Sequence, residues 1–163
     1  MTTHSEQYLT FIVRGEEHAV PILRVREIIE FETVTRVPGT PAWVRGVINL
    51  RGTILPVVDL SAKFGGDESV VTKTTCTVVV ETQHRGEIIP IGVMADAVSE
   101  VLDFASEQIE PAPAFGTHVR VDYLLGMGKL DRKLVLILDI DRLLSPVELE
   151  SAVVAASEVA IAS

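Results

Sequence analysis

The sequence has little of what metal sites, disulfide-stabilised folds and nucleic-acid-binding proteins require. Cys76 is the single cysteine in 163 residues, which excludes an internal disulfide and a cysteine-based zinc site. Basic residues are scarce, since 14 Lys and Arg stand against 23 Asp and Glu, a formal net charge of −9. Such a chain repels phosphate, so we expect neither nucleic-acid binding nor docking on an anionic membrane surface.

Long hydrophobic runs are also missing. No apolar run approaches the roughly 18 residues of a membrane-spanning helix, so we expect no direct membrane insertion. The first seven residues are polar and carry no export pattern, which favours the cytoplasm. Hydrophobic residues nevertheless make up 47% of the chain, enough to form a sizeable core.

Motifs that carry catalysis are absent from the sequence. None of the four histidines has the spacing of a metal ligand, and the chain contains no phosphate-binding loop and no nucleophile elbow. Cys76 stands in an alternating apolar strand, which indicates a buried and unreactive thiol. We therefore expect no catalytic residue, no bound metal and no cofactor.

Most of the sequence reads as short β-strands. Residues 8–13 and 18–22 are rich in β-branched and aromatic residues and flank a turn, so they predict a hairpin. Residues 47–50 and 53–58 predict a second hairpin around the turn Arg51-Gly52. This pattern indicates a mainly β protein.

Two stretches are expected to be helical. Ile22, Val25 and Ile29 fall at helical spacing and predict a short helix after the first hairpin. Ser145-Pro146 followed by Glu148 is typical of a helix start and predicts a C-terminal helix or tail over 146–163.

The second half of the chain repeats the first. Trp43–Gly46 aligns with Tyr123–Gly126, and Val25–Phe31 aligns with Val98–Phe104. The offset is larger for the first of these pairs than for the second, so the second copy carries an insertion between them. Units longer than the roughly 20–50 residues of a solenoid repeat predict two related subdomains instead.

The repeat predicts one domain, residues 7–145, made of subdomains at about 7–65 and 74–145. Each has about five short strands and no long helical crossover, so small closed barrels fit best. Units of this size are marginal alone, and the two should share an apolar seam.

Asp59 is the most suggestive acidic residue. It ends an apolar strand, as the phosphate-accepting aspartate of a receiver domain does, but the acidic pair that would hold magnesium is missing. The repeat places Asp139 at the same position, which favours a helix cap for both residues.

Glu27 and Arg51 are a pair of opposite charges that can interact. Arg51 lies in the turn of the second hairpin, beside Asn49, the single asparagine. Opposite charges on two elements of one small subdomain can lock those elements together, although exposed pairs contribute only about 0–1 kcal/mol.

A long run in the second hairpin identifies a family resemblance. Residues 46–60, Gly-Val-Ile-Asn-Leu-Arg-Gly-Thr-Ile-Leu-Pro-Val-Val-Asp-Leu, closely resemble the signature of CheW-like chemotaxis coupling proteins. The resemblance covers nearly all of residues 7–145 and includes Arg24–Ile28, Thr40–Trp43, Ile109–Pro113, Tyr123–Gly126 and Leu134–Leu144.

The resemblance implies two tandem SH3-like five-stranded barrels with short helices, and an adaptor without enzymatic activity. Such proteins couple the cytoplasmic tips of methyl-accepting chemoreceptors to the regulatory domain of the histidine kinase CheA, in arrays associated with the membrane. Weak self-association is left open. The receptor tip is a helical hairpin that lies along a groove between the barrels.

Site residues follow from the same resemblance. The positions that match the receptor-binding surface are Val25, Glu27, Ile28, Arg45, Gly46 and Arg51. The positions that match the kinase-binding loop are Glu110, Pro111 and Phe115. Many relatives carry a basic residue where this chain has Glu110.

Alternatives remain beside this interpretation. The chain could be a CheW-like module cut from a fusion with a receiver domain or from a kinase regulatory domain. It could be an enzyme with Asp59 as phosphoacceptor, or a barrel adaptor for another peptide. The absence of a catalytic domain in 163 residues favours the adaptor.

Overall fold

Short strands make up most of the protein, as the sequence predicts. The computed structural model describes residues 5–32, 34–111, 121–130 and 132–162. The elements in chain order are β1 (Ser5–Val13), β2 (Glu16–Pro21), η1 (Ile22–Arg24), β3 (Val25–Glu30), β4 (Val44–Leu50), β5 (Thr53–Asp59), α1 (Leu60–Lys63), β6 (Cys76–His84), β7 (Glu87–Ala95), β8 (Ala97–Ala105), η2 (Ser106–Gln108), β9 (Ile109–Glu110), η3 (Val121–Tyr123), β10 (Leu124–Leu130), β11 (Lys133–Leu138), α2 (Ile140–Leu143) and α3 (Pro146–Ala162).

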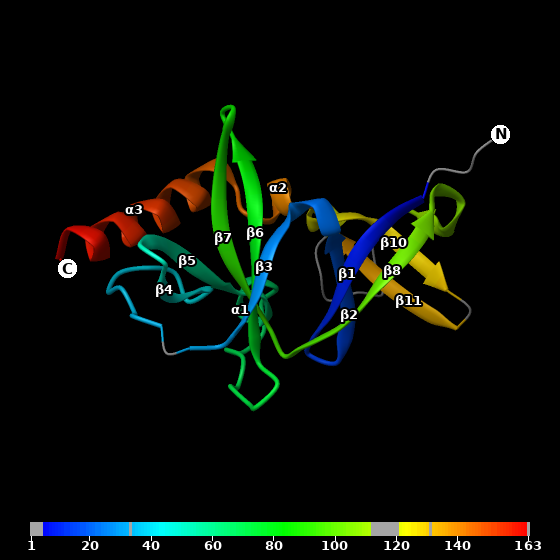
Figure 1. The fold of residues 1–163 in the computed structure, drawn as a ribbon, viewed down its shortest axis with the longest axis horizontal. Coiled ribbons are helices and arrows are strands. Elements are labelled where there is room, and N and C mark those ends of the chain that lie inside the picture. Colours follow the sequence, from blue (N-terminus) through cyan, green and yellow to red (C-terminus); the bar gives the residue numbers. More distant parts are fainter. Residues whose placement is uncertain (1–4, 33, 112–120, 131, 163) are drawn as a thin grey trace.

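The strands form two sheets that lie side by side along the long axis of the molecule (Figure 1). The first, here called the β1 sheet, has the order β8-β1-β2-β11-β10-β9. The second, here called the β3 sheet, has the order β3-β6-β7-β5-β4. Most neighbours are antiparallel, and in each sheet one parallel pair, β2 with β11 or β7 with β5, joins strands from distant parts of the chain.

The sheets do not follow the boundaries of about 7–65 and 74–145 expected for the two subdomains. The hairpin β1–β2 from the first half completes the β1 sheet, and the hairpin β6–β7 from the second half completes the β3 sheet. Each half thus supplies a hairpin to the other. Because half a chain of this length buries little surface alone, the exchange gives both halves one shared core.

The exchange keeps the internal duplication intact. Interchanging β1, β2, β3, β4 and β5 with β6, β7, β8, β10 and β11 converts one strand order into the other, apart from the additional edge strand β9. A bulge lies at Val44/Gly46 and again at Leu124/Gly126. A Cβ at Gly46 would lie 2.6 Å from the carbonyl oxygen of Thr35, so the neighbouring backbone can approach only a glycine.

The predicted helix over Ile22, Val25 and Ile29 is wrong beyond its first turn. η1 ends at Arg24, and residues 25–30 continue as the edge strand β3. Half-buried and exposed residues alternate along β3, and its backbone pairs with β6. Three apolar positions in so short a stretch are compatible with both the helical period of about 3.6 residues and the strand period of about two. Pairing with β6 therefore decided in favour of the strand.

One hydrophobic core runs through both sheets, as expected for a shared seam. It joins Phe11 and Val20 of the β1 sheet to Val58 and Val78 of the β3 sheet. The C-terminal helix is confirmed as α3, which packs along β5 and β4 (Figure 1). Within the described part of the chain, no helix is both long and apolar enough to cross a membrane.

Ser145 and Glu148 begin α3 as the sequence predicts. The hydroxyl of Ser145 accepts a hydrogen bond from the Glu148 N–H at 3.1 Å, and Glu148 Oε1 accepts one from the Ser145 N–H at 2.8 Å. This reciprocal pair satisfies two backbone donors that the first turn of a helix leaves unpaired.

Candidate functional site

Arg51 is presented by a tight hairpin turn between β4 and β5. The turn consists of Arg51 with φ of 51° and Gly52 with φ of 89°, the geometry that matches the twist of paired strands. The Asn49 side chain accepts a hydrogen bond from the Gly52 N–H at 2.8 Å. A left-handed backbone conformation costs a non-glycine residue roughly 1–2 kcal/mol, so Arg51 lowers the stability of the turn that exposes it.

Arg51 and Glu27 form the ion pair that the sequence suggested, through Arg51 Nη2 and Glu27 Oε2. Glu27 lies on β3 and Arg51 adjoins β4, and these are the two edge strands of the β3 sheet. The pair therefore bridges the sheet's edges rather than fixing a helix. Glu27 Oε1 is buried and has no hydrogen-bond partner among the described residues.

Val25 and Ile28 take different positions on β3. Val25 is half-buried and packs against the core, whereas Ile28 keeps 44% of its surface exposed. Successive residues of a strand point to opposite faces, so Ile28 faces away from Glu27. Of the two, Ile28 is the apolar residue available to a partner.

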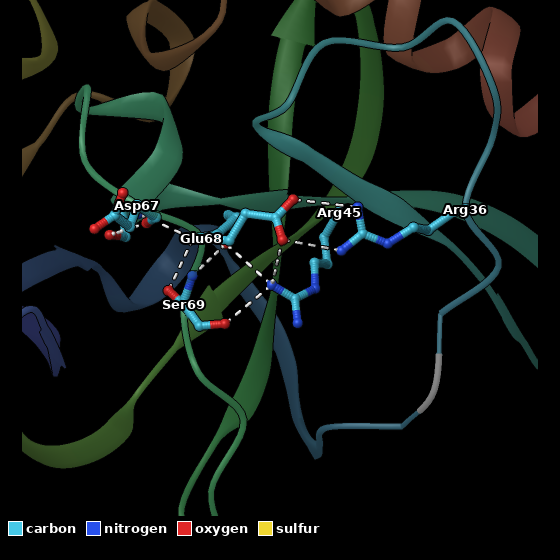
Figure 2. A network of polar contacts seen from close by, with 7 residues as sticks. Arg36, Arg45, Asp67, Glu68 and Ser69 are labelled. Carbon is cyan, nitrogen blue, oxygen red and sulfur yellow. Dashed lines mark hydrogen bonds and ion pairs between the residues drawn. The ribbon is translucent and has the colours of Figure 1, made fainter.

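Arg45 and Gly46 are turned into the protein. Gly46 is buried against Thr35, and the Arg45 side chain is only 14% exposed. Arg45 Nη1 donates to the backbone oxygen of Ser69 at 3.0 Å (Figure 2). The same nitrogen lies 3.4 Å from Asp59 Oδ2. Neither residue offers a free surface.

Asp59 is the fully buried centre of this network. Its carboxylate accepts hydrogen bonds from the Ser61 N–H at 3.1 Å, the Ser69 N–H at 2.8 Å and the Ser69 hydroxyl at 2.8 Å. The bond to Ser61 caps α1, so the predicted capping role is confirmed. A carboxylate with these partners and no exposure is poorly placed to accept a phosphoryl group.

Glu68 extends the network to the loop that follows β3. Arg36 donates two parallel hydrogen bonds to Glu68, at 3.2 and 3.1 Å (Figure 2). These bonds and the nearby charge hold the pKa of the Glu68 carboxyl below its usual value. The composition of residues 65–69 predicts a linker. In the structure this segment is held in place, because Glu68 binds Arg36 and Ser69 binds Asp59.

The predicted kinase-binding positions lie at the far side of the β1 sheet. Glu110 ends β9 and is exposed, and Pro111 beside it is also exposed. Lys129 Nζ lies 2.8 Å from Glu110 Oε2, so this acidic departure from many relatives has a partner within the chain. Phe115 lies outside the described residues.

Metal and thiol chemistry find no support in the described residues. Within the described ranges, no group of three or more His, Cys, Asp or Glu residues is placed to hold a metal ion. Cys76 is buried, and burial raises the pKa of its thiol, which makes the reactive thiolate rarer.

Comparison with known proteins shows the family to which the chain belongs. Residues 7–148 match the family model of the CheW-like domain. The chain belongs to the CheW-like family. The chemotaxis protein CheW of Klebsiella aerogenes is 37% identical over 147 residues, which cover 90% of this chain and 86% of that protein. The chemotaxis protein CheW of Helicobacter pylori is 36% identical over 85% of this chain and 81% of that protein.

A solved structure shares the fold. The scaffolding protein TtCheW from Thermoanaerobacter tengcongensis matches with a TM-score of 0.79 and 29% identity, over 90% of this chain and 92% of that one. The two sheets are therefore the two SH3-like barrels of a CheW-like fold, and the chain is a chemotaxis adaptor. The alternative of a module cut from a receiver fusion or a kinase receives no support from these relatives.

Sequence reasoning missed the role of Arg45 in orienting Ser69 and Asp59. The available signal was a departure from the internal repeat. In the second copy, the position equivalent to Arg45 is Leu125. One half has Arg45 where the other has an apolar residue, and this half also contains the capping residue Asp59. The difference indicates an ion pair between Arg45 and Asp59 that is specific to this half.

Proposed function

We propose that this adaptor binds two partners through separate surfaces and does so without catalysing a reaction. One partner is the helical tip of a chemoreceptor, and the other is the regulatory domain of the kinase CheA. In this role the protein works in the cytoplasm, at receptor arrays beside the membrane. The observation that carries the proposal is the Arg51–Glu27 pair, whose arginine occupies the hairpin turn within the family's signature run.

The receptor surface is proposed to lie on the β3 sheet. Arg51 and Glu27 supply a charge pair on one side of the edge strand β3, and Ile28 supplies an exposed apolar residue on its other side. A helix docks through apolar anchors and through polar contacts at its edges, which these residues can provide. Gly46 and Arg45 contribute indirectly, because both are turned inward.

The kinase surface is proposed to lie at the other end of the molecule, around Glu110 and Pro111 on the β1 sheet. Two separate faces allow one adaptor to hold both partners at once. Each contact can then be weak, on the order of micromolar, because linkage raises the effective concentration of the second partner.

Calorimetry with a receptor cytoplasmic fragment and with the kinase regulatory domain, separately and together, tests this proposal. Arg51→Glu is expected to abolish receptor binding and to leave kinase binding unchanged. Arg85→Glu is a matched control, since Arg85 occupies the same left-handed turn position in the β6–β7 hairpin, with φ of 50°. Normal receptor binding by Arg51→Glu, or equal losses in both variants, would show that the site is assigned wrongly.

A further inference from the structure

The half of the β4–β5 hairpin that carries the Arg51-Gly52 turn has few supports from other strands. In the described part of the chain, β5 pairs with β7 only over residues 57–59, at the end of β5 away from the turn. On the other side, β4 is an edge strand, bordered by an isolated bridge between Thr35 and Val47. Strand pairing therefore leaves the turn and residues 53–56 projecting from the rest of the β3 sheet.

An open pocket separates the projecting half of β5 from β7. It has a volume of about 330 Å³ and lies between the start of β5, residues 88–90 of β7 and α3. Gly52 and Thr53 line it on the side of the turn, and Val153 and Ala156 line it on the side of α3. The start of β7 therefore does not pack closely against the turn, and the remaining wall of the pocket is α3.

α3 packs directly against the projecting half of the hairpin (Figure 1). Ala155 and Ala156 are 3% and 5% exposed, and they form an apolar cluster with Val47 of β4 and Ile54 of β5. Ile54 is the cross-strand partner of Asn49, whose side chain accepts the hydrogen bond that closes the turn. Contact with α3 thus reaches the residue pair next to the turn.

The first turn of α3 is fixed at the seam between the two sheets. Glu148 pairs with Lys63, whose ammonium lies 5.3 Å from the centre of the Tyr123 ring, just before β10 of the β1 sheet. Leu149 is 4% exposed and belongs to the core that both sheets share. A helix of 17 residues is about 25 Å long, so α3 connects this seam to the projecting hairpin.

The internal duplication shows that such a hairpin folds without a helix. In the β1 sheet the equivalent hairpin is β10–β11, and β11 pairs with β2 only over residues 136 and 137 in the described register. Leu134, the equivalent of Ile54, is 53% exposed, and the short strand β9 pairs with β10 instead. The helix is therefore not needed to form the hairpin, and it is present on the half that carries Arg51.

We infer that α3 positions Arg51 for receptor binding, by holding the projecting half of the β4–β5 hairpin in a fixed place relative to the seam. The inference rests on the proposed function, in which the receptor tip contacts Arg51. Ala155 and Ala156 act through Val47 and Ile54 and do not touch the receptor. Without their contact the hairpin stays folded but its turn moves, so fewer molecules hold Arg51 ready to bind and the apparent affinity falls.

Two neighbouring substitutions on α3 test this inference by calorimetric titration with a receptor cytoplasmic fragment. Ala155→Asp places a charge between α3 and the hairpin and is expected to weaken receptor binding about tenfold. Val154→Asp is the matched control, since Val154 is 55% exposed on the same helix, and should bind within about twofold of the parent protein. Binding of the kinase regulatory domain should be unchanged in both. Parent-like receptor binding by folded Ala155→Asp would overturn the inference.

A second matched pair removes the contact from the side of the hairpin without burying a charge. Ile54→Ala is expected to weaken receptor binding about threefold, because it removes part of the packing against α3. Leu134→Ala changes the equivalent position of the other hairpin, where the side chain is exposed, and should leave receptor binding unchanged. Equal losses in these two variants would contradict a role for α3. If Ala155→Asp does not fold, this pair decides.

Hydrogen exchange and a double variant distinguish positioning from direct contact with the receptor. In Ala155→Asp the amides of residues 50–54 should exchange faster, whereas those of residues 92–94, which pair with the other end of β5, should stay protected. The double variant Arg51→Ala/Ala155→Asp should lose less affinity than the two single losses combined, because α3 acts through Arg51. Weakened binding with unchanged exchange, or strictly additive losses, would refute the positioning role.

Arg51→Glu separates failure of this inference from failure of the proposed function. Loss of receptor binding in Arg51→Glu together with parent-like binding in Ala155→Asp and Ile54→Ala overturns the inference alone. Parent-like binding in all three variants overturns both. Thermal unfolding of each variant ensures that a loss of binding is assigned only to folded protein.

Discussion

Asp59 and Asp139 occupy equivalent positions in the two halves of the chain, and each accepts a hydrogen bond of 3.1 Å from the backbone N–H of the second residue after it. Each backbone N–H of these aspartates also donates to an aromatic residue's carbonyl oxygen at 2.8 Å, to Trp43 in one half and to Tyr123 in the other. Their surroundings differ, because Asp59 is fully buried beside Arg45 and Asp139 is partly exposed.

Asp59→Ala is expected to destabilise the protein by about 3 kcal/mol, because it removes a helix cap and leaves Arg45 without its buried partner. Asp139→Ala removes a cap and an exposed ion pair with Arg142, and should cost about 1 kcal/mol. Urea unfolding of both variants measures the difference. Equal losses would contradict a structural role for the Arg45 contact.

His18 should make the protein sensitive to acid. It is stacked between Phe11 and Phe64, and burial lowers the pKa of His18 from 6.5 to about 4. The folded state binds the proton less tightly than the unfolded state. The stabilisation is therefore complete above pH 6.5 and falls as the pH drops toward 4, by about 3 kcal/mol in all.

His18→Leu isolates this effect. The strand pairing places Ile91 at the equivalent position in the other half, so an aliphatic side chain fits this environment. The variant's unfolding free energy should change less between pH 7 and pH 5 than that of the parent, measured by urea titration at each pH. Parallel pH profiles for the two proteins would refute the assignment.

Lys63 is expected to hold α3 to the body of the protein. Its side chain is 5% exposed, its ammonium lies 5.0 Å from the centre of the Trp43 ring and 5.3 Å from that of Tyr123, and it pairs with Glu148. Lys63→Ala should cost about 3 kcal/mol, because it removes a buried ammonium from the Glu148 carboxylate and from the two aromatic rings. Trp43 is the single tryptophan, so its fluorescence should change as well.

Lys129→Ala provides the comparison for Lys63. Lys129 pairs with Glu110 at 2.8 Å, but both side chains are 54% exposed, so its loss should cost less than about 1 kcal/mol. A loss in Lys63→Ala no greater than this, with unchanged fluorescence, would show that α3 is held by its apolar contacts alone.

Gly46→Ala is expected to destabilise the β4 edge by about 2 kcal/mol, since the new methyl group would press on the Thr35 backbone. The backbone pair between Thr35 and Val47, with bonds of 3.0 and 2.9 Å, should open, and amide exchange at Val47 reports this directly. Retained protection at Val47 together with parent stability would count against the close approach.

Local sequence signals predicted much of the fold. The Arg-Gly turns, the capping residues Asp59 and Ser145, and the alternating strands each act within a few residues, and the structure contains all of them. The helix expected after Ile22 failed because pairing with β6, a strand distant in the sequence, decides between strand and helix. The opposite charges of Glu27 and Arg51 suggested an ion pair, which the structure contains.

The sequence by itself determined a duplicated, mainly β chain with an acidic surface and no pattern of catalytic residues. Only the tertiary structure decided that the halves exchange their hairpins and that Arg45 turns inward to Asp59 and Ser69. The reason is that strand pairing and burial of charge depend on which distant segments share a core. Composition and spacing along the chain do not specify that choice.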